Sequence, residues 1–96
     1  MLSIEQNILI DLARILVQYM EINNISGVEL TKQSKIHTTQ IAHCRKLARG
    51  DRDFSKIKLH YTVLIRTLMD LGFNIHLHYE NKNYRQSVEW PLQQIA

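Results

Sequence analysis

The chain has 96 residues, of which 45% are hydrophobic, and it carries a formal net charge of +3. This length and composition predict one small folded domain and exclude a disordered chain. No apolar run is long enough to span a bilayer and no signal peptide is visible, so we expect a cytoplasmic protein without a membrane segment.

The positive charge is concentrated in the middle of the chain. Residues 27–66 contain nine lysines and arginines against three acidic residues, a net charge of +6. Residues 1–26 have one cation against three acids, and residues 67–96 have two against three. A localised basic segment is the electrostatic pattern of a nucleic-acid-binding protein. Lysines scattered over a solvated face, the alternative, would not predict this clustering.

A first helix is predicted from Ser3 to about Ile22. Ser3 and Gln6 fit a capping box, in which each side chain bonds to the other residue's backbone N–H. Asn23 and Asn24, which tolerate left-handed backbone, are expected to end the helix. Its apolar face recurs every three or four residues and consists of Ile8, Leu12, Ile15, Leu16, Tyr19 and Met20, widened by Leu9, Ala13 and Val17.

Two short helices joined by a tight turn are predicted within residues 25–49. Ser26 and Glu29 fit a second capping box, which begins one helix near Gly27, and the next helix begins near Thr38. A helix that enters the DNA major groove needs polar tips for base edges and nearby cations for phosphates. We predict that base edges are read by Thr38, Thr39, Gln40 and His43. We predict that phosphates are neutralised by Lys32, Lys46, Arg49, Arg52 and Lys56.

Two alternatives to this DNA-binding interpretation stay open. The outer face of the second helix could be a solvated surface that binds nothing. For Arg49, a structural role at the helix C-terminus, before the stop at Gly50, competes with phosphate contact because cations complement the helix dipole there.

A last helix is predicted from about Ser55 to Leu71, followed by a strand. Residues 73–79 alternate between apolar and polar, so one strand face carries Phe73, Ile75, Leu77 and Tyr79. The chain offers no second convincing strand, so we expect antiparallel pairing with the same strand of a second copy, with these four residues at the dimer interface. Reading two half-sites about 34 Å apart also requires a dimer.

Residues 81–96 are expected to form a polar tail behind a domain of residues 1–80. Two interpretations of Trp90 stay open. Either the tail is flexible and Trp90 anchors a protein partner, as tryptophans often do, or the tail folds back and Trp90 covers the core.

The stretch 25–47 resembles the helix-turn-helix of phage-repressor-like regulators, the Xre or Cro/C1-type family. The matching positions are Ile25-Ser26, Glu29-Leu30, Ile36 and Ile41-Ala42. The resemblance implies a mainly α domain of four to five helices that binds double-stranded DNA. Lys35 stands where the family usually has a turn glycine, so Lys35 is left-handed or the turn has another shape. Gly27 replaces a glutamine that often touches a phosphate.

The order of elements is most similar to that of HipB-type antitoxins, a resemblance that includes Leu68–Tyr79 and Glu89-Trp90. It implies a homodimer that binds a palindromic operator and represses its own operon, in complex with a HipA-like serine/threonine kinase toxin. A phage or chromosomal repressor without a toxin and a HigA-like antitoxin are alternatives. A protein-interaction module that has lost DNA binding is another, which the departures at Lys35 and Gly27 keep open.

No enzyme, cofactor or metal site is predicted. Cys44 is the only cysteine, which fits a reducing compartment. His43 and Cys44 are helix neighbours that point about 100° apart, a poor nucleophile–base pair, so we expect Cys44 to pack inward. His76 and His78 share a strand face and could supply two metal ligands, but they lack the Cys/His spacing of a structural zinc site.

Overall fold

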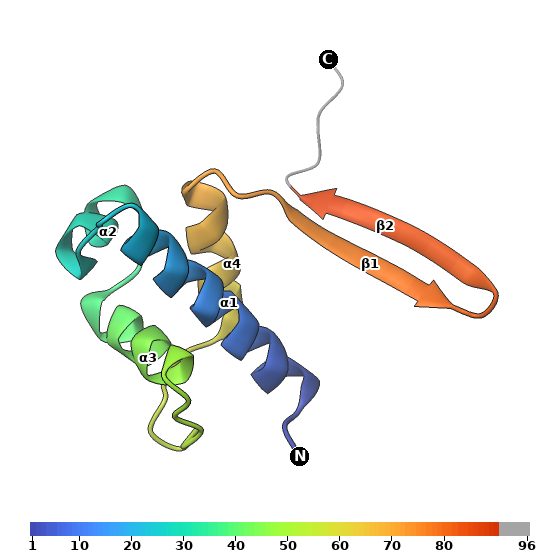
Figure 1. Cartoon of the computed structure of the whole chain (residues 1–96), viewed down its shortest axis with the longest axis horizontal. Helices are drawn as coiled ribbons and strands as arrows, with labels where there is room; N and C mark the ends of the chain where they lie inside the picture. The colour runs from blue at the N-terminus through green and yellow to red at the C-terminus, as the bar shows by residue number, and fades with distance from the viewer. Residues whose placement is uncertain (91–96) are drawn as a thin grey trace.

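The protein is mainly helical, with a small antiparallel strand pair at its C-terminal side (Figure 1). A computed structural model describes residues 1–90, with side chains at all of these positions except 77, 79 and 88–90. Within this range, no helix is both long and apolar enough to cross a membrane. The elements are α1 (Ile4–Ile22), α2 (Gly27–Gln33), α3 (Thr38–Ala48), α4 (Tyr61–Asp70), β1 (Ile75–Asn81) and β2 (Tyr84–Trp90).

Local polar bonds set the first helix ends where the sequence predicts them. The backbone N–H of Gln6 donates to Ser3 Oγ (3.0 Å), and the N–H of Ser3 donates to Gln6 Oε1 (2.9 Å). The same reciprocal pair joins Ser26 and Glu29, at 3.1 and 3.3 Å. Asn24, just after α1, has a φ of +52°, which confirms the left-handed stop. The two capping pairs satisfy backbone N–H groups that the first turn of a helix leaves without a partner.

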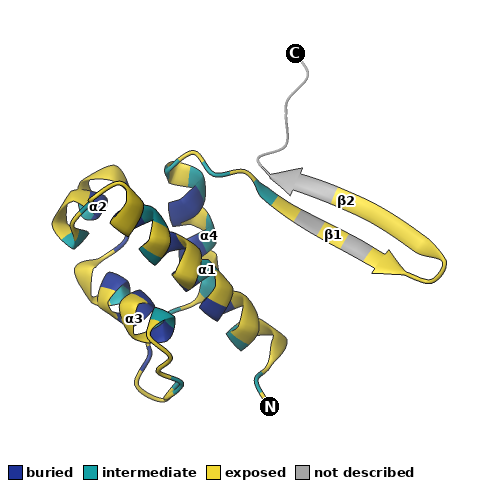
Figure 2. Ribbon diagram, in the orientation of Figure 1, coloured by how far each residue is buried: buried dark blue, intermediate teal, exposed yellow. Residues whose placement is uncertain are grey.

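The core lies where the helices face one another (Figure 2). α1 packs against α3 and α4, and α2 packs against α3. A part-buried hydrogen bond from Ser34 Oγ to Asp70 Oδ2 (2.9 Å) joins the turn after α2 to the end of α4. The buried apolar residues are Leu9, Ile10, Ala13, Leu16, Met20, Leu30, Ile36, Ile41, Cys44, Leu47, Ile57, Leu64 and Leu68.

The apolar face predicted for α1 is only partly its core face. Leu16 and Met20 are buried as expected, but Ile8 and Ile15 are exposed. Because apolar residues occupy both sides of this helix, their spacing alone did not separate the side that faces α3 and α4 from the side that faces solvent.

The prediction of a helix over residues 55–71 is wrong at its start, because α4 begins at Tyr61. Residues 54–56 form a turn instead, in which the N–H of Lys56 donates to the carbonyl oxygen of Asp53 (3.1 Å) and Ser55 Oγ donates to Asp53 Oδ1 (2.5 Å). Local bonds from aspartate side chains compete with helix formation. His60 then caps α4, since its Nδ1 accepts a backbone N–H of the first turn at 3.3 Å.

The prediction of a lone strand is also wrong, because β1 pairs with β2 of the same chain. The antiparallel register joins Ile75 to Trp90 and Asn81 to Tyr84. The predicted polar tail is therefore a strand as far as residue 90, and residues 91–96 lie outside the described part of the chain. β2 escaped prediction because polar residues dominate it, which hides its alternation. β1 therefore has a strand partner within its own chain.

Candidate nucleic-acid interface

One side of α3 is exposed along its whole length. Its residues recur every three or four positions, the period of one helix face. The opposite side is buried in the core through Ile41, Cys44 and Leu47. We call the exposed set the α3 outer face, and it consists of Thr38, Thr39, Ala42, Arg45, Lys46 and the C-cap residue Arg49.

The residues predicted to read base edges do not all lie on this face. Thr38 and Thr39 do, at the N-terminal end of α3. Gln40 is half-buried, and its Oε1 accepts the backbone N–H of His37 at 3.0 Å, so it helps to define the helix start. His43 is only 9% exposed. Its assignment to the outer face is wrong.

His43 instead joins α3 to the loop before α4. Its Nδ1 accepts the backbone N–H of Lys58 at 3.2 Å, in a part-buried position. We expect His43→Ala to lower the free energy of unfolding by about 1–3 kcal/mol, because the Lys58 N–H loses its acceptor. His43→Asn should lose less, since its amide oxygen can replace Nδ1. Urea unfolding of both variants checks this, and wild-type stability of His43→Ala would contradict it.

Sequence reasoning missed Ala42 and Arg45 on the α3 outer face. A signal was present, because Thr38, Ala42, Arg45 and Arg49 follow one another at steps of four, three and four residues. The prediction instead selected polar residues and disregarded an alanine, although alanine can contact the methyl group of thymine.

Four of the five predicted phosphate-binding residues lie on α2, on α3 or just after α3, and they differ in exposure. Lys32, Lys46 and Arg49 are exposed on α2 and α3. Arg52 is half-buried, and its Nη1 donates to the carbonyl oxygens of Leu47 (2.9 Å) and Asp51 (2.7 Å). Arg52 therefore closes the C-terminal end of α3, a role that competes with phosphate contact.

Lys56 does not lie at a helix N-terminus, because α4 begins five residues later. Its Nζ lies 3.8 Å from Asp53 Oδ2, and both side chains are largely exposed. Exposed ion pairs of this kind contribute little to stability. Lys56 is thus a surface cation in the loop between α3 and α4.

None of residues 34–37, which form the turn between α2 and α3, has a left-handed backbone. Among residues 1–90 the non-glycine position with positive φ is Asn24, so Lys35 is not left-handed. Ser34 is instead extended, with φ −145° and ψ 168°. A Cβ at Gly27 would meet Arg45 and Ile41 at ordinary contact distance, 3.8 Å. Neither Lys35 nor Gly27 has a left-handed backbone here.

Arg45 brings positive charge close to the start of α2. Its Nη1 lies 3.8 Å from the position that a Cβ on Gly27 would occupy. Arg45 is exposed beside Lys46 on α3. Lys32 and Lys35 are exposed at the end of α2 and in the turn. The cations of residues 27–49 therefore lie on α2, on α3 and in the turn between them, and the polar residues Thr38 and Thr39 lie at the start of α3.

Cys44 is buried as predicted. Burial raises the pKa of its thiol to about 12, so the reactive thiolate is not formed near neutral pH. This cysteine is a core residue.

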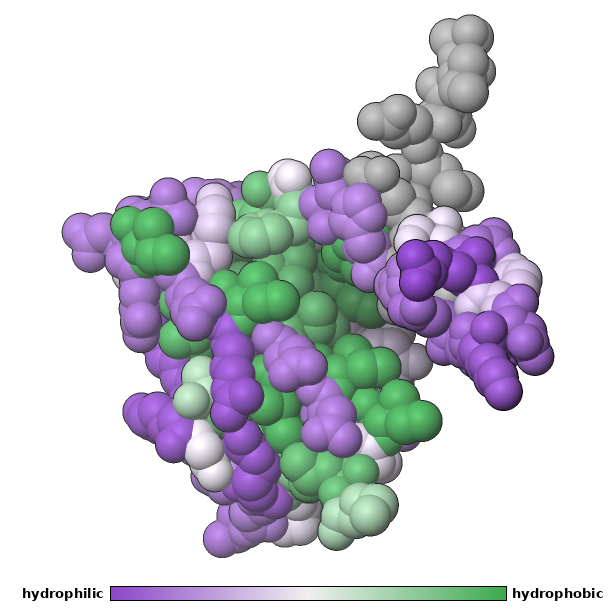
Figure 3. All heavy atoms as spheres, turned by 45° about the vertical axis from the view of Figure 1, so that its right-hand side comes forward, coloured by the Kyte–Doolittle hydropathy of each residue, from purple (hydrophilic) through white to green (hydrophobic). Residues whose placement is uncertain are grey.

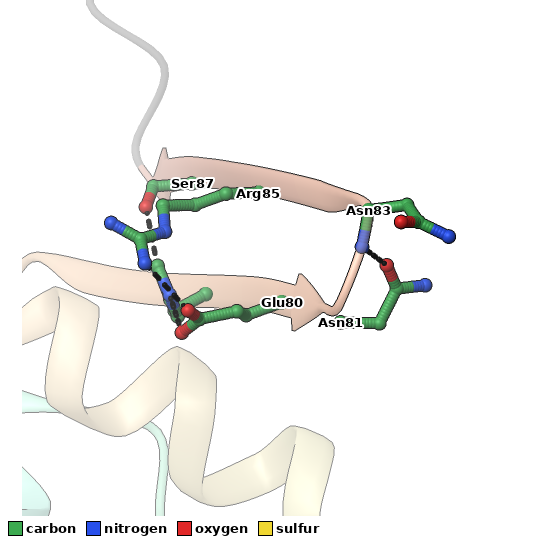
Figure 4. A network of polar contacts seen from close by, with 6 residues as sticks. Glu80, Asn81, Asn83, Arg85 and Ser87 are labelled. Carbon is green, nitrogen blue, oxygen red and sulfur yellow. Dashed lines mark hydrogen bonds and ion pairs between the residues drawn. The ribbon is translucent and has the colours of Figure 1, made fainter.

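The exposed face of the hairpin carries a polar network (Figure 4). Glu80 accepts hydrogen bonds from Arg85 Nη2 (2.6 Å) and from His78 Nε2 (3.1 Å). The hydrogen bond with His78, and then that with Arg85, lowers the pKa of Glu80. His78 Nδ1 lies 2.9 Å from Ser87 Oγ. Within the described residues, no group of three or more His, Cys, Asp or Glu side chains is arranged to hold a metal ion.

Two of the four residues predicted at the dimer interface can be examined. Phe73 packs edge-on against Tyr19 of α1, with ring centroids 5.4 Å apart. Ile75 is half-buried at the start of β1. The side chains of Leu77, Tyr79 and Trp90 lie outside the described part of the structure.

Comparison of the chain with protein-family models, curated proteins and solved structures found no match.

Proposed function

We propose that the chain is a sequence-specific DNA-binding protein that places α3 in the major groove. The observation that carries this proposal is the α3 outer face, which combines short polar side chains at the N-terminal end of the helix with three cations behind them. A recognition helix needs this arrangement. In this proposal α2, the turn at residues 34–37 and α3 form a helix-turn-helix.

We divide the exposed residues of α2 and α3 into those that contact base edges and those that contact phosphates. Thr38, Thr39 and Ala42 are the residues we assign to base edges, because hydroxyl groups can bond to several bases and a methyl side chain can contact thymine. The phosphate contacts, which position the helix without reading sequence, are assigned to Lys32, Arg45, Lys46 and Arg49. We assign no catalytic step to the chain.

We further propose that the protein is a transcriptional repressor. Its resemblance to HipB-type antitoxins favours a homodimer that binds a palindromic operator, represses its own operon and binds a HipA-like serine/threonine kinase toxin. A repressor of the same family without a toxin is the alternative within this class. The two differ in whether a kinase partner co-purifies with the chain.

The proposal is tested by measuring binding to DNA upstream of the coding sequence and to random DNA of equal length, over a series of salt concentrations. We expect tight, salt-sensitive binding to the upstream DNA and weaker binding to the random DNA. Equal, weak binding to both would leave only non-specific electrostatic attraction and would favour a protein-interaction module.

The same assay tests the base-reading residues. Thr39→Ala should weaken binding to the upstream DNA by about 1 kcal/mol, because one hydrogen bond to a base edge is lost. Binding to random DNA should not change, which provides the internal control. Equal losses on both DNAs would remove Thr39 from the base-reading set.

A further inference from the structure

A groove lies between α1 and α3, which pack against each other. It consists of two hollows, of about 250 Å³ and about 230 Å³. Val17 and Glu21 of α1 and Ala48 of α3 line both hollows, so the two adjoin. We call this space the α1–α3 groove. It borders the α3 outer face, because Arg45 and Arg49 belong to the lining of the larger hollow.

The floor of the α1–α3 groove is apolar. Met20 is buried, with 3% of its surface exposed, and Val17, Ile25 and Ala48 are half-buried. Ala48 has the shortest of these side chains and so leaves space between the two helices. Apolar side chains reach the surface of the helical part, whereas the hairpin is largely hydrophilic (Figure 3). A ligand with an apolar body is therefore expected to bind the helical part.

The rim of the groove is cationic. Arg45 and Arg49 line the larger hollow, Arg14 lines the smaller one, and all three are exposed. Among the described residues, Glu21 is the acidic member of the lining. Within residues 1–90, none of these four side chains forms an ion pair. The lining therefore carries an excess of positive charge, and its guanidinium groups keep donors available for an anion.

An apolar floor under a cationic rim fits an aliphatic carboxylate. Its head group can accept two hydrogen bonds from one guanidinium group, and its chain would remove the floor from water. A DNA phosphate would use the rim but not the floor. An engineered cavity of about 150 Å³ holds benzene, with its six carbon atoms, so the larger hollow of about 250 Å³ has room for roughly ten heavy atoms. Octanoate has this size, whereas a membrane lipid is much larger.

We propose that the α1–α3 groove binds a free aliphatic carboxylate of about eight carbons, with its chain on the apolar floor and its head group on the arginines. The ligand also releases DNA, an effect that rests on the proposed function, in which Arg45 and Arg49 contact phosphates. A head group that engages these two guanidinium groups competes with the DNA for them. Ligand and DNA therefore weaken each other's binding.

The first test is equilibrium dialysis of the full chain against octanoate, without DNA. We expect a dissociation constant of about 1 mM or lower, because a small ligand gains affinity with each heavy atom that it buries. Octylamine, which has a chain of the same length and a positive head group, should bind at least about tenfold more weakly because the arginines repel it. Absence of octanoate binding up to about 10 mM, or tighter binding of octylamine, would overturn the proposal.

Two variants locate the bound ligand. Ala48→Leu fills the groove and should weaken octanoate binding at least about tenfold. Arg49→Gln removes one cation from the rim and should weaken it about threefold to tenfold. Arg66→Gln is the matched control, since it removes the same charge from an exposed position of α4, and its octanoate affinity should equal that of the wild type. Circular dichroism verifies folding, and the exposed Arg49 keeps the test available if Ala48→Leu does not fold. Wild-type affinity in a folded Ala48→Leu protein, or equal losses in the two arginine variants, would overturn the proposal.

The effect on DNA is measured separately. Octanoate at about ten times its dissociation constant should weaken binding to the upstream DNA by about tenfold, as competition for one site predicts. Acetate at the same concentration is the salt control and should have little effect, since it lacks the chain. Unchanged DNA affinity in octanoate, or an equal loss in acetate, would overturn the regulatory effect. The dialysis contains no DNA, so a chain that binds octanoate but no DNA would disprove the proposed function and leave the carboxylate site standing.

Discussion

Replacing Leu47 with alanine is expected to lower the free energy of unfolding by about 2–5 kcal/mol. Leu47 is fully buried, on the side of α3 that faces the core, where α3 packs against α1. The substitution removes buried apolar surface and leaves a cavity that the neighbouring helices fill only in part. A domain of this size is stable by only about 5–15 kcal/mol in total, so the loss is a large fraction of its stability.

Urea unfolding followed by circular dichroism measures this loss. Val28→Ala is the matched control, since it shortens an aliphatic side chain at an exposed position of α2. That control should change stability by less than about 0.5 kcal/mol. If Leu47→Ala loses no more than the control does, then α3 does not pack on α1 through this residue, and the orientation of the α3 outer face would have to be revised.

Neutralising Arg45 and Lys46 together is expected to weaken binding to every DNA sequence. Both residues are exposed on α3, and Arg45 lies beside the start of α2. If each contacts one phosphate, replacing both with glutamine removes about 1.8 from the slope of log K against log salt. The counterion contribution then predicts a loss of about 30-fold at roughly 0.15 M salt, of similar size on upstream and random DNA.

The matched control removes two arginines elsewhere on the surface. Arg14→Gln/Arg66→Gln changes the net charge by the same amount, and the two residues are exposed on α1 and α4. This variant should retain nearly the wild-type salt slope, because charges more than a Debye length from the DNA are screened. A slope that falls equally in both double variants would mean that net charge matters and that the α3 outer face does not contact phosphates.

Local chemistry explains which predictions from sequence were right. The capping pairs Ser3–Gln6 and Ser26–Glu29 join residues only three positions apart, so they are readable without a fold. The same holds for the left-handed Asn24. The start of α4 was misplaced because the turn at residues 54–56, held by bonds of Ser55 and Lys56 to Asp53, competes with the helix that the apolar spacing predicts.

Packing explains which predictions were wrong. His43 is polar and adjoins outward-facing residues, so the sequence favoured an exposed position, but its ring accepts a backbone N–H fifteen residues away. Ile8 and Ile15 of α1 were expected to belong to the core, yet Leu9, Ile10, Ala13, Leu16 and Met20 already fill the side that the other helices cover. Whether such a residue is buried depends on residues far away in the sequence. The spacing of its neighbours in the chain does not reveal those partners.

The sequence by itself therefore determined the order of the helices found in residues 1–90, the ends set by local caps and the concentration of positive charge in residues 27–66. These depend on neighbours three or four residues apart and on composition. Only the tertiary structure decided that β1 pairs with β2, that the face of α3 left exposed includes Ala42 and Arg45 but not His43, and that Ile8 and Ile15 of α1 lie outside the core of the described residues. The physical reason is that burial and strand pairing depend on which elements meet in space, which a helix's own periodicity does not specify.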